Sequence, residues 1–208
     1  MFHIHNMASK ENTVLIGVSK FISNFFNPLT SLFLYLVYYN VTNFTLKKGL
    51  QNFLELILLL LVPIIIWIFV NVKKGNYTNM DVSNRHQRKS LYFFIAALLG
   101  GYLAVNYFLH DVVDLRILFI GILLLAMQFS NYFIKSSMHT SFNIFVAALF
   151  FVQNPWLGFI WFLLSILIGI TRVILKRHTT KEVISGGLIA ILVSIVYIFV
   201  YISSHYQA

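Results

Sequence analysis

The chain of 208 residues contains no cysteine. Disulfides, thiolate metal sites and a cysteine nucleophile are therefore excluded. Charged residues are also scarce, at 10% of the chain, whereas a soluble domain is about 25% charged. Acidic residues are rarest, with six Asp and Glu against 15 Lys and Arg and a formal charge of +9. Because the basic residues lie between apolar stretches, this charge favours lipid head groups or a phosphorylated substrate as partners and argues against nucleic acid.

Apolar residues are correspondingly abundant. They make up 59% of the chain, and the mean hydropathy is +0.82. Windows of about 20 mostly apolar residues recur, each long enough to cross a hydrocarbon core of about 30 Å. The sequence therefore predicts an all-α, polytopic transmembrane helical bundle of six to seven spans. We expect one integral membrane domain over residues 1–208, with no separate soluble domain and no cleavable signal peptide.

Residues 1–28 are expected to form a tail and a first helix. The apolar residues of 13–27, such as Val14, Val18 and Phe21, share one helical face. This pattern predicts an interfacial amphipathic helix that ends before Pro28. A short, steeply inclined span is the alternative.

The remaining spans follow from the apolar windows and the prolines. Pro63 is expected to kink the second span without ending it, and Asn154-Pro155 separates the fifth from the sixth. The expected spans cover residues 29–46, 51–72, 91–109, 116–134, 140–153, 157–175 and 183–203.

Seven spans would place the loops alternately on the two sides of the membrane. One side would receive residues 73–90, 135–139 and 176–182 together with the N-terminal tail. The unusual polar residues are almost all in these three loops. A helical bundle could bring the loops together on one face.

The first loop contains DVSNRHQRKS, with Arg85 and Arg88 three residues apart. On a helix, this spacing puts two guanidinium groups on one face, which suits them to bind phosphate oxygens. A positively charged loop beside a membrane span is the simpler interpretation.

The second loop contains KSSMHTS, residues 135–141, in which Ser137 and His139 stand at the start of a span. Free backbone N–H groups and the helix dipole favour an anion there. A hydroxyl, exposed amides and an imidazole would form a phosphate site with a proton donor. Alternatively, Ser137 is only a helix N-cap and His139 an interfacial side chain.

The third loop contains TRVILKRHTTKE, residues 171–182. His178 and Glu182 are four apart and share a helical face. A carboxylate that accepts one imidazole N–H leaves the other nitrogen free as a nucleophile or base. Thr179-x-x-Glu182 is also a capping-box pattern, which would explain Glu182 but neither His178 nor Arg172.

These three segments resemble the signatures of the phosphatidic acid phosphatase type 2 superfamily, in the same order over residues 81–182. The third segment resembles Ser-Arg-x5-His-x3-Asp, with Thr171-Arg172, His178 and Glu182. The second resembles Pro-Ser-Gly-His but has Met138 in place of glycine, which affects a close amide contact with phosphate. The first resembles Lys-x6-Arg-Pro least, because it offers Arg85 and Arg88 without the proline and without a lysine seven residues earlier.

The resemblance implies the core fold of that superfamily and hydrolysis of a lipid or isoprenoid phosphate monoester or diphosphate, without metal or cofactor. By analogy, His178 would attack phosphorus while Glu182 holds its ring, and His139 would protonate the leaving alkoxide and then activate water. Phosphate oxygens would be bound by the remaining candidates: Arg85, Arg88, Arg172, Ser137 and, outside the quoted motifs, Lys135.

Two other functions remain open: a non-catalytic membrane protein that binds anionic lipid, and a transporter. Only Glu55 and the Pro63 kink favour transport.

Location in the membrane is predicted from charge. Three of the 15 Lys and Arg residues, Lys47, Lys48 and Arg116, lie on the far side from the three loops. The positive-inside rule therefore puts the candidate site on the cytoplasmic face of a bacterial inner (plasma) membrane. The resemblance implies the outer face instead.

Overall fold

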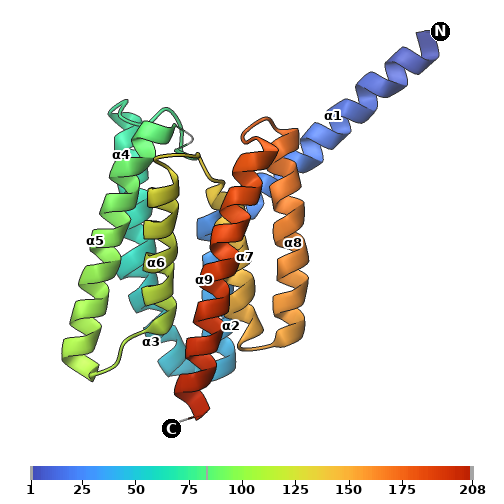
Figure 1. Ribbon diagram of the computed structural model, residues 1–208. Helices are drawn as coiled ribbons and strands as arrows, with labels where there is room; N and C mark the ends of the chain where they lie inside the picture. The colour runs from blue at the N-terminus through green and yellow to red at the C-terminus, as the bar shows by residue number, and fades with distance from the viewer. Residues whose placement is uncertain (1, 83, 207–208) are drawn as a thin grey trace.

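The computed structural model describes residues 2–82 and 84–206, and the side chains of residues 13–82 and 84–204. Within these residues every regular element is a helix, and the helices form an upright bundle from which the N-terminal helix projects (Figure 1). The prediction of an all-α protein is confirmed. Met1, Ser83, Gln207 and Ala208 of the expected domain lie outside the described residues, as do the side chains of the polar tail.

The helices follow one another along the chain with short connections. In order they are α1 (Phe2–Phe25), α2 (Pro28–Asn43), α3 (Leu46–Leu56), η1 (Ile57–Leu61), α4 (Val62–Lys73), α5 (Arg85–His110), α6 (Leu115–Ser130), α7 (Met138–Phe151), α8 (Pro155–Ile174) and α9 (Thr180–Tyr206).

Within the described part of the chain, four helical stretches are long and apolar enough to cross a membrane by themselves, and a bent pair would make a fifth. This confirms a helical membrane protein, while the expectation of six to seven spans is met only in part. The difference lies in α6 and α7, which have 16 and 14 residues. At 1.5 Å per residue, α7 is only about 21 Å long, less than the hydrocarbon core of about 30 Å. The four stretches are Leu46–Lys73, Arg85–His110, Pro155–Ile174 and Thr180–Ser204.

α1 ends before Pro28, as expected, and the chain bends by 56° between Thr13–Phe25 and Pro28–Asn43. Asn27 caps α2, since its side chain accepts hydrogen bonds from the Leu29 and Thr30 backbone N–H groups. The helix starts much earlier than residue 13, the predicted first residue. Its apolar side chains, such as Phe21, are exposed, while Ser19 and Ser23 are buried. α1 therefore packs on α8 through its small polar residues and leaves its apolar face outward, which suits a lipid environment.

Pro63 does not end its helix. α3, η1 and α4 form one apolar stretch of 28 residues. The π-helical turn η1 over Ile57–Leu61 leads into α4, and Pro63 is the second residue of α4. Because proline has no N–H to donate to the preceding turn, a local change of helical pitch accommodates it at small cost. The prediction that the helix continues beyond Pro63 is confirmed.

α7 is the centre of the bundle. It packs against α2, α6, α8 and α9, and every residue from His139 to Phe150 is buried. α9 approaches its start so closely that a Cβ at Gly186 would lie 2.7 Å from Ser141 Oγ. The N-terminus of α7, with His139 at its second position, is thereby fixed between neighbouring helices.

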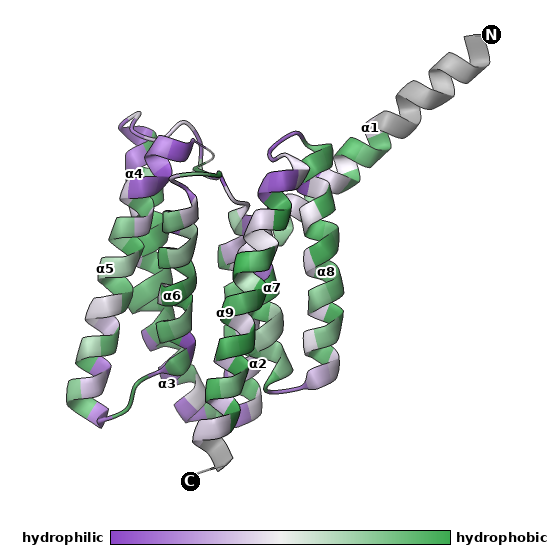
Figure 2. Ribbon diagram, in the orientation of Figure 1, coloured by the Kyte–Doolittle hydropathy of each residue, from purple (hydrophilic) through white to green (hydrophobic). Residues whose placement is uncertain are grey.

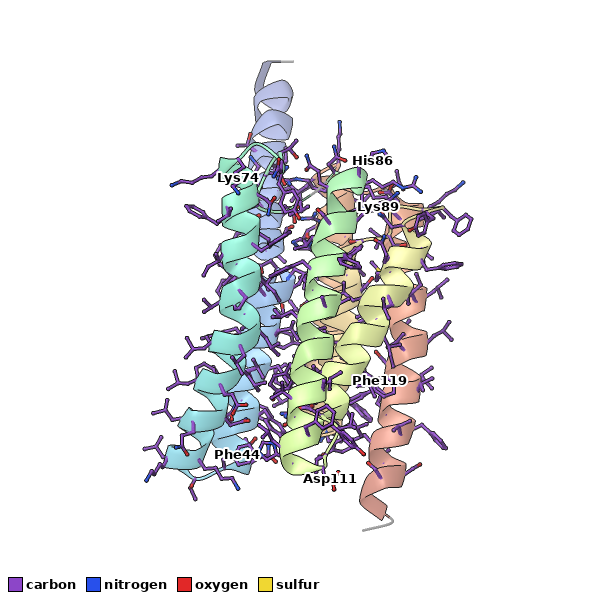
Figure 3. All side chains as sticks on the ribbon, turned by 90° about the vertical axis from the view of Figure 1, so that its left-hand side faces the viewer. Phe44, Lys74, His86, Lys89, Asp111 and Phe119 are labelled. Atoms are coloured by element: carbon purple, nitrogen blue, oxygen red, sulfur yellow. The ribbon has the colours of Figure 1, made fainter. Side chains whose placement is uncertain are left out.

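Hydrophilic residues gather at the two ends of the bundle, and most residues between the ends are hydrophobic (Figure 2). Lys74, His86 and Lys89 lie at one end, and Phe44 and Asp111 at the other (Figure 3). The connections between α4 and α5, α6 and α7, and α8 and α9 all lie at the first end (Figure 1). We call this end, defined by residues 74–84, 131–137 and 175–179, the site end.

Candidate active site

Hydrogen bonds join the three loops of the site end. Arg88 Nη1 donates to the Ser136 carbonyl at 3.1 Å, which links the first loop to the second. The Ser137 N–H donates to the Glu182 carbonyl at 3.0 Å, and the Ser136 and Ser185 hydroxyls are 2.9 Å apart, which links the second to the third. The structure thus brings together segments about 100 residues apart in the sequence.

His178 and Glu182 form a pair, with His178 Nδ1 2.9 Å from Glu182 Oε2. The carboxylate accepts the Nδ1 proton, so Nε2 carries the free lone pair. Nε2 is buried and has no hydrogen-bond partner among the described residues. Burial and then the positive charge of Arg88 lower the pKa of the His178 imidazole below its ordinary 6.5, against the opposing effect of Glu182. At neutral pH, His178 is therefore an unprotonated imidazole with one nitrogen available.

Glu182 also forms the capping box that the sequence offered as an alternative role. Its Oε2 accepts the Thr179 N–H at 3.1 Å, and the Glu182 N–H donates to the Thr179 hydroxyl at 3.3 Å. The same carboxylate oxygen receives the His178 proton. Glu182 therefore has both roles. It completes the capping box at the start of α9, and it orients the imidazole of His178, which directly precedes Thr179.

Two buried arginines lie close to the histidines. Arg172 Nη1 donates to Ser23 Oγ of α1 at 2.9 Å, and its Nε is buried without a partner. Arg88 donates through Nε to the Val82 carbonyl at 3.0 Å. The charges of both arginines act on His139 and on His178.

Arg85 does not share this environment. Its Nε donates to the Asn131 carbonyl at 2.5 Å, and Asn131 Nδ2 donates back to the Arg85 carbonyl at 3.2 Å. The two arginines of the first loop therefore diverge. Arg88 turns inward to the histidines, while Arg85 holds the loop between α6 and α7 in place.

Ser137 and Lys135 take different positions in the second loop. The Ser137 side chain is buried and makes no capping hydrogen bond, although it stands at the N-cap position of α7. Its Oγ instead accepts from the Thr140 hydroxyl at 3.1 Å. Lys135 is half-buried, and burial followed by the charge of Arg88 lowers the pKa of its ammonium group. Lys135 is thus a partly exposed cation at the edge of the site.

Asp81 belongs to the site, and the sequence reasoning did not single it out. Its Oδ2 accepts from Arg172 Nη2 at 2.8 Å and Arg177 Nη1 at 3.2 Å. Its Oδ1 lies 3.4 Å from His139 Nε2. The sequence contained one signal for Asp81. It stands seven residues before Arg88, which is the position of the lysine relative to the arginine in the first signature. Arg177 was missed as well, although it directly precedes His178.

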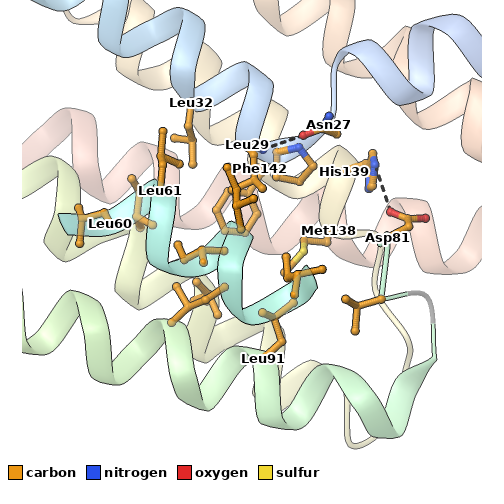
Figure 4. Close-up of a pocket in the computed structure, with 18 of the residues that line it drawn as sticks. Asn27, Leu29, Leu32, Leu60, Leu61, Asp81, Leu91, Met138, His139 and Phe142 are labelled. Carbon is orange, nitrogen blue, oxygen red and sulfur yellow. Dashed lines mark hydrogen bonds and ion pairs between the residues drawn. The ribbon is translucent and has the colours of Figure 1, made fainter. Parts of the chain in front are cut away.

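A cavity of about 580 Å³ begins beside His139 and Asp81. It continues between α2, α4, α5, α6 and α7, lined mainly by leucine and isoleucine side chains (Figure 4). Met138, which replaces the signature glycine, also lines it. Since both His139 and Leu149 line the cavity, it follows α7 for about 15 Å. Of the site residues, Asp81, His139 and Arg177 line the cavity, whereas His178, Arg88 and Arg172 are not among its lining residues. The cavity thus has charged residues at the His139 end and a mainly apolar interior, with Arg116 also on its lining.

Comparison with models of known protein families finds no match, and comparison with curated proteins and with solved structures finds none either. The class is defined by the structure itself: an all-helical membrane protein with histidines, arginines and carboxylates gathered at one end. No group of three or more His, Asp or Glu side chains in the described part of the chain could hold a metal ion.

Proposed function

We propose that this protein hydrolyses a lipid phosphate monoester or diphosphate through a phosphohistidine intermediate, without a metal or cofactor. The observation that carries the proposal is His178, whose Nδ1 is paired with Glu182 while its buried Nε2 has no partner in the part of the chain that the structure describes. An oriented, neutral imidazole beside two arginines is suited to attack a phosphorus atom. The three signature-like segments of the sequence support the same chemistry.

In the first step, His178 Nε2 forms a bond to phosphorus and the bond from phosphorus to the lipid oxygen breaks. His139 gives its proton to that leaving oxygen, so that a neutral alcohol departs. When the substrate is a diphosphate, the bond from the terminal phosphorus to the bridging oxygen breaks instead, and the lipid monophosphate departs. Glu182 stabilises the positive charge that develops on the His178 ring. In the second step, His139 takes a proton from water, the hydroxide attacks phosphorus, and the N–P bond breaks to release phosphate.

Positive charges near the histidines would stabilise the phosphoryl oxygens. Arg88 and Arg172 are buried, so their charges act in a medium of low polarity, where each is worth more than in water. Lys135 and Arg177, which are more exposed, would attract an anionic head group to the site end. Ser137 and Arg85 would act indirectly, by fixing the second loop.

The cavity supports a lipid as the substrate. An anionic head group would lie among the charged residues at its His139 end, and a hydrocarbon chain would extend along its leucine and isoleucine walls. A volume of about 580 Å³ is in the usual range for small-molecule sites. By the same resemblance, we propose the core fold of type 2 phosphatidic acid phosphatases with six to seven spans, in a bacterial inner membrane.

The proposal is tested by phosphate release in detergent with EDTA present. The substrates are phosphatidate, a phosphatidylglycerophosphate, and isoprenyl mono- and diphosphates. We expect release by the wild type and release near background for His178→Ala and His139→Ala. His86→Ala is the matched control, because His86 lies exposed at the same end (Figure 3) and should keep full activity. If folded wild-type protein releases no phosphate from any of these lipids, the proposal fails and lipid binding without catalysis becomes the better explanation.

A further inference from the structure

Asp81 is the residue on which three different elements converge. It receives Arg172 from α8, Arg177 from the α8–α9 loop and His139 from α7, through contacts of 2.8, 3.2 and 3.4 Å. Its side chain is 20% exposed. Among the described residues of the site, Glu182 is the one other carboxylate, and it is paired with His178.

The backbone beside Asp81 is held in an uncommon conformation. Val82 has a φ of 44°, a left-handed value that is costly for a β-branched residue. The side chain of Val82 is buried, its N–H donates to the Asn79 carbonyl, and its carbonyl accepts from Arg88. The same buried arginine that acts on both histidines therefore fixes the turn that presents Asp81.

Asp81 is ionised at neutral pH. Burial acts to raise its pKa, but the charges of His139, Arg172 and Arg177 outweigh burial and hold the pKa of its carboxyl below the usual 3.8. A full negative charge thus faces His139 Nε2.

The other charged groups around His139 have the opposite effect on it. Burial, and then the charges of Arg172 of α8, Arg88 of α5 and His178 of the α8–α9 loop, lower the pKa of the His139 imidazole to about 3, and Asp81 is the group that opposes them. A group that protonates a leaving alkoxide must carry a proton when the substrate is bound. In the free protein His139 is therefore neutral at neutral pH, and the negative charges of Asp81 and of a bound phosphate must act together for its ring to carry that proton.

We propose that Asp81 is a positioning residue that orients His139 and stabilises its protonated form for transfer of a proton to the leaving group. Each of the two imidazoles then has its own carboxylate, Glu182 for His178 and Asp81 for His139. This inference rests on the proposed function.

The alternative role for Asp81 is competition with the substrate. Its carboxylate binds Arg172, which would stabilise phosphoryl oxygens, and Arg177, which would attract the anionic head group. In that case removal of the charge would strengthen phosphate binding and leave the chemical step unchanged. The two roles therefore predict different results on loss of the charge: a lower kcat with little change in KM for a positioning residue, and a lower KM with unchanged kcat for a competitor.

The test is Asp81→Asn, which keeps the size of the side chain and removes its charge. Each variant is assayed on an alkyl phosphate, whose leaving oxygen needs a proton, and on a nitrophenyl phosphate, whose leaving oxygen does not. We expect kcat on the alkyl ester to fall about 100-fold, with KM changed by less than about threefold and the alkaline limb of the kcat profile moved to lower pH. On the nitrophenyl ester, kcat/KM, which reports only the steps up to departure of the leaving group, should change by less than about threefold.

Two further variants support the comparison. Asp81→Glu should restore part of the alkyl activity, and Asp111→Asn should change nothing, because Asp111 is exposed at the opposite end (Figure 3).

Three results would overturn the inference. A lower KM and a lower inhibition constant for inorganic phosphate with unchanged kcat would show that Asp81 competes with substrate. Equal losses on both esters without a shift of the pH profile would show a purely structural role. Wild-type protein that hydrolyses neither ester would instead overturn the proposed function, and the inference with it.

Discussion

At the scale of single residues, Glu182 carries two roles on one oxygen. Oε2 accepts the Thr179 N–H that begins α9 and also pairs with His178 Nδ1. Capping of a helix needs only a side-chain acceptor, which glutamine provides as well as glutamate. Control of an imidazole needs the negative charge. A single substitution can therefore separate the two roles.

Glu182→Gln should keep the capping box and lose activity. We expect the midpoint of thermal unfolding to change by less than about 3 °C, because the glutamine side chain retains the capping hydrogen bond. We expect kcat to fall between about 10² and 10⁴-fold, because the His178 ring loses the charge that orients it and stabilises its positive form. Loss of Glu182 also removes an effect that raises the pKa of His178, so the acid limb of the kcat/KM profile should move to lower pH. An unfolded variant, or an active one with an unmoved acid limb, would contradict this assignment.

At the scale of elements, the cavity depends on how α2 and the stretch from α3 to α4 are arranged. α2 and α3 are in close contact at Gly49, where a Cβ would lie 2.9 Å from the Asn40 carbonyl oxygen. Beyond this contact, residues of α2, η1 and α4 all line the cavity. The π-helical turn of η1 provides Leu60 and Leu61 to its wall. The irregular helix before Pro63, which the sequence predicts as a simple kink, therefore forms part of the cavity wall.

Leu60→Trp should shorten the hydrocarbon chain that the cavity accepts. Each methylene that enters an apolar cavity contributes about 0.8 kcal/mol, or about fourfold in affinity. In the wild type, kcat/KM for a series of n-alkyl phosphates should rise with chain length until the chain fills the cavity. In the variant this rise should stop at a shorter chain, while the shortest esters react as before.

Leu58→Trp is the matched control, because Leu58 lies on the same turn but is 58% exposed. Chain-length profiles that coincide for the two variants would show that the chain binds elsewhere.

The same elements show what could be foreseen locally. The helix ends at Asn27-Pro28 and Asn154-Pro155 were predicted, since an asparagine cap followed by proline is a short-range signal. The length of α1 was not predicted, because the residues between its start at Phe2 and residue 13 show no apolar periodicity that would indicate a helix. The structure supports four or five of the six to seven expected spans, because apolar composition does not distinguish a membrane-crossing helix from a short central one such as α7.

At the scale of the whole molecule, most of the basic residues and the candidate active site lie at the same end of the bundle. The three loops with most of the basic residues lie together at the site end (Figure 2). The positive-inside rule puts that end in the cytoplasm, whereas the resemblance implies the outer face. Because the chain has no cysteine, an introduced thiol reports one position without background.

Labelling with a membrane-impermeant thiol reagent decides between these orientations. From the charge distribution, we expect Asn76→Cys at the site end to react only after the cells are permeabilised. Val113→Cys, at the opposite end, should react in intact cells. Both positions are exposed, and neither substitution changes the charge of a loop. The reverse pattern would place the candidate site on the outer face.

The sequence by itself determined the helical membrane class, the grouping of the three polar loops and the His178–Glu182 pair. These features follow from local rules: apolar windows of membrane length, and a spacing of four residues that puts two side chains on one helical face. Only the tertiary structure showed that Asp81 joins His139 and that Arg85 and Arg88 diverge. It alone placed Ser137 away from a capping role and revealed an apolar cavity beside the charged residues. Such features depend on how each helix is rotated and how closely it packs against its neighbours, and a pattern within one segment does not contain that information.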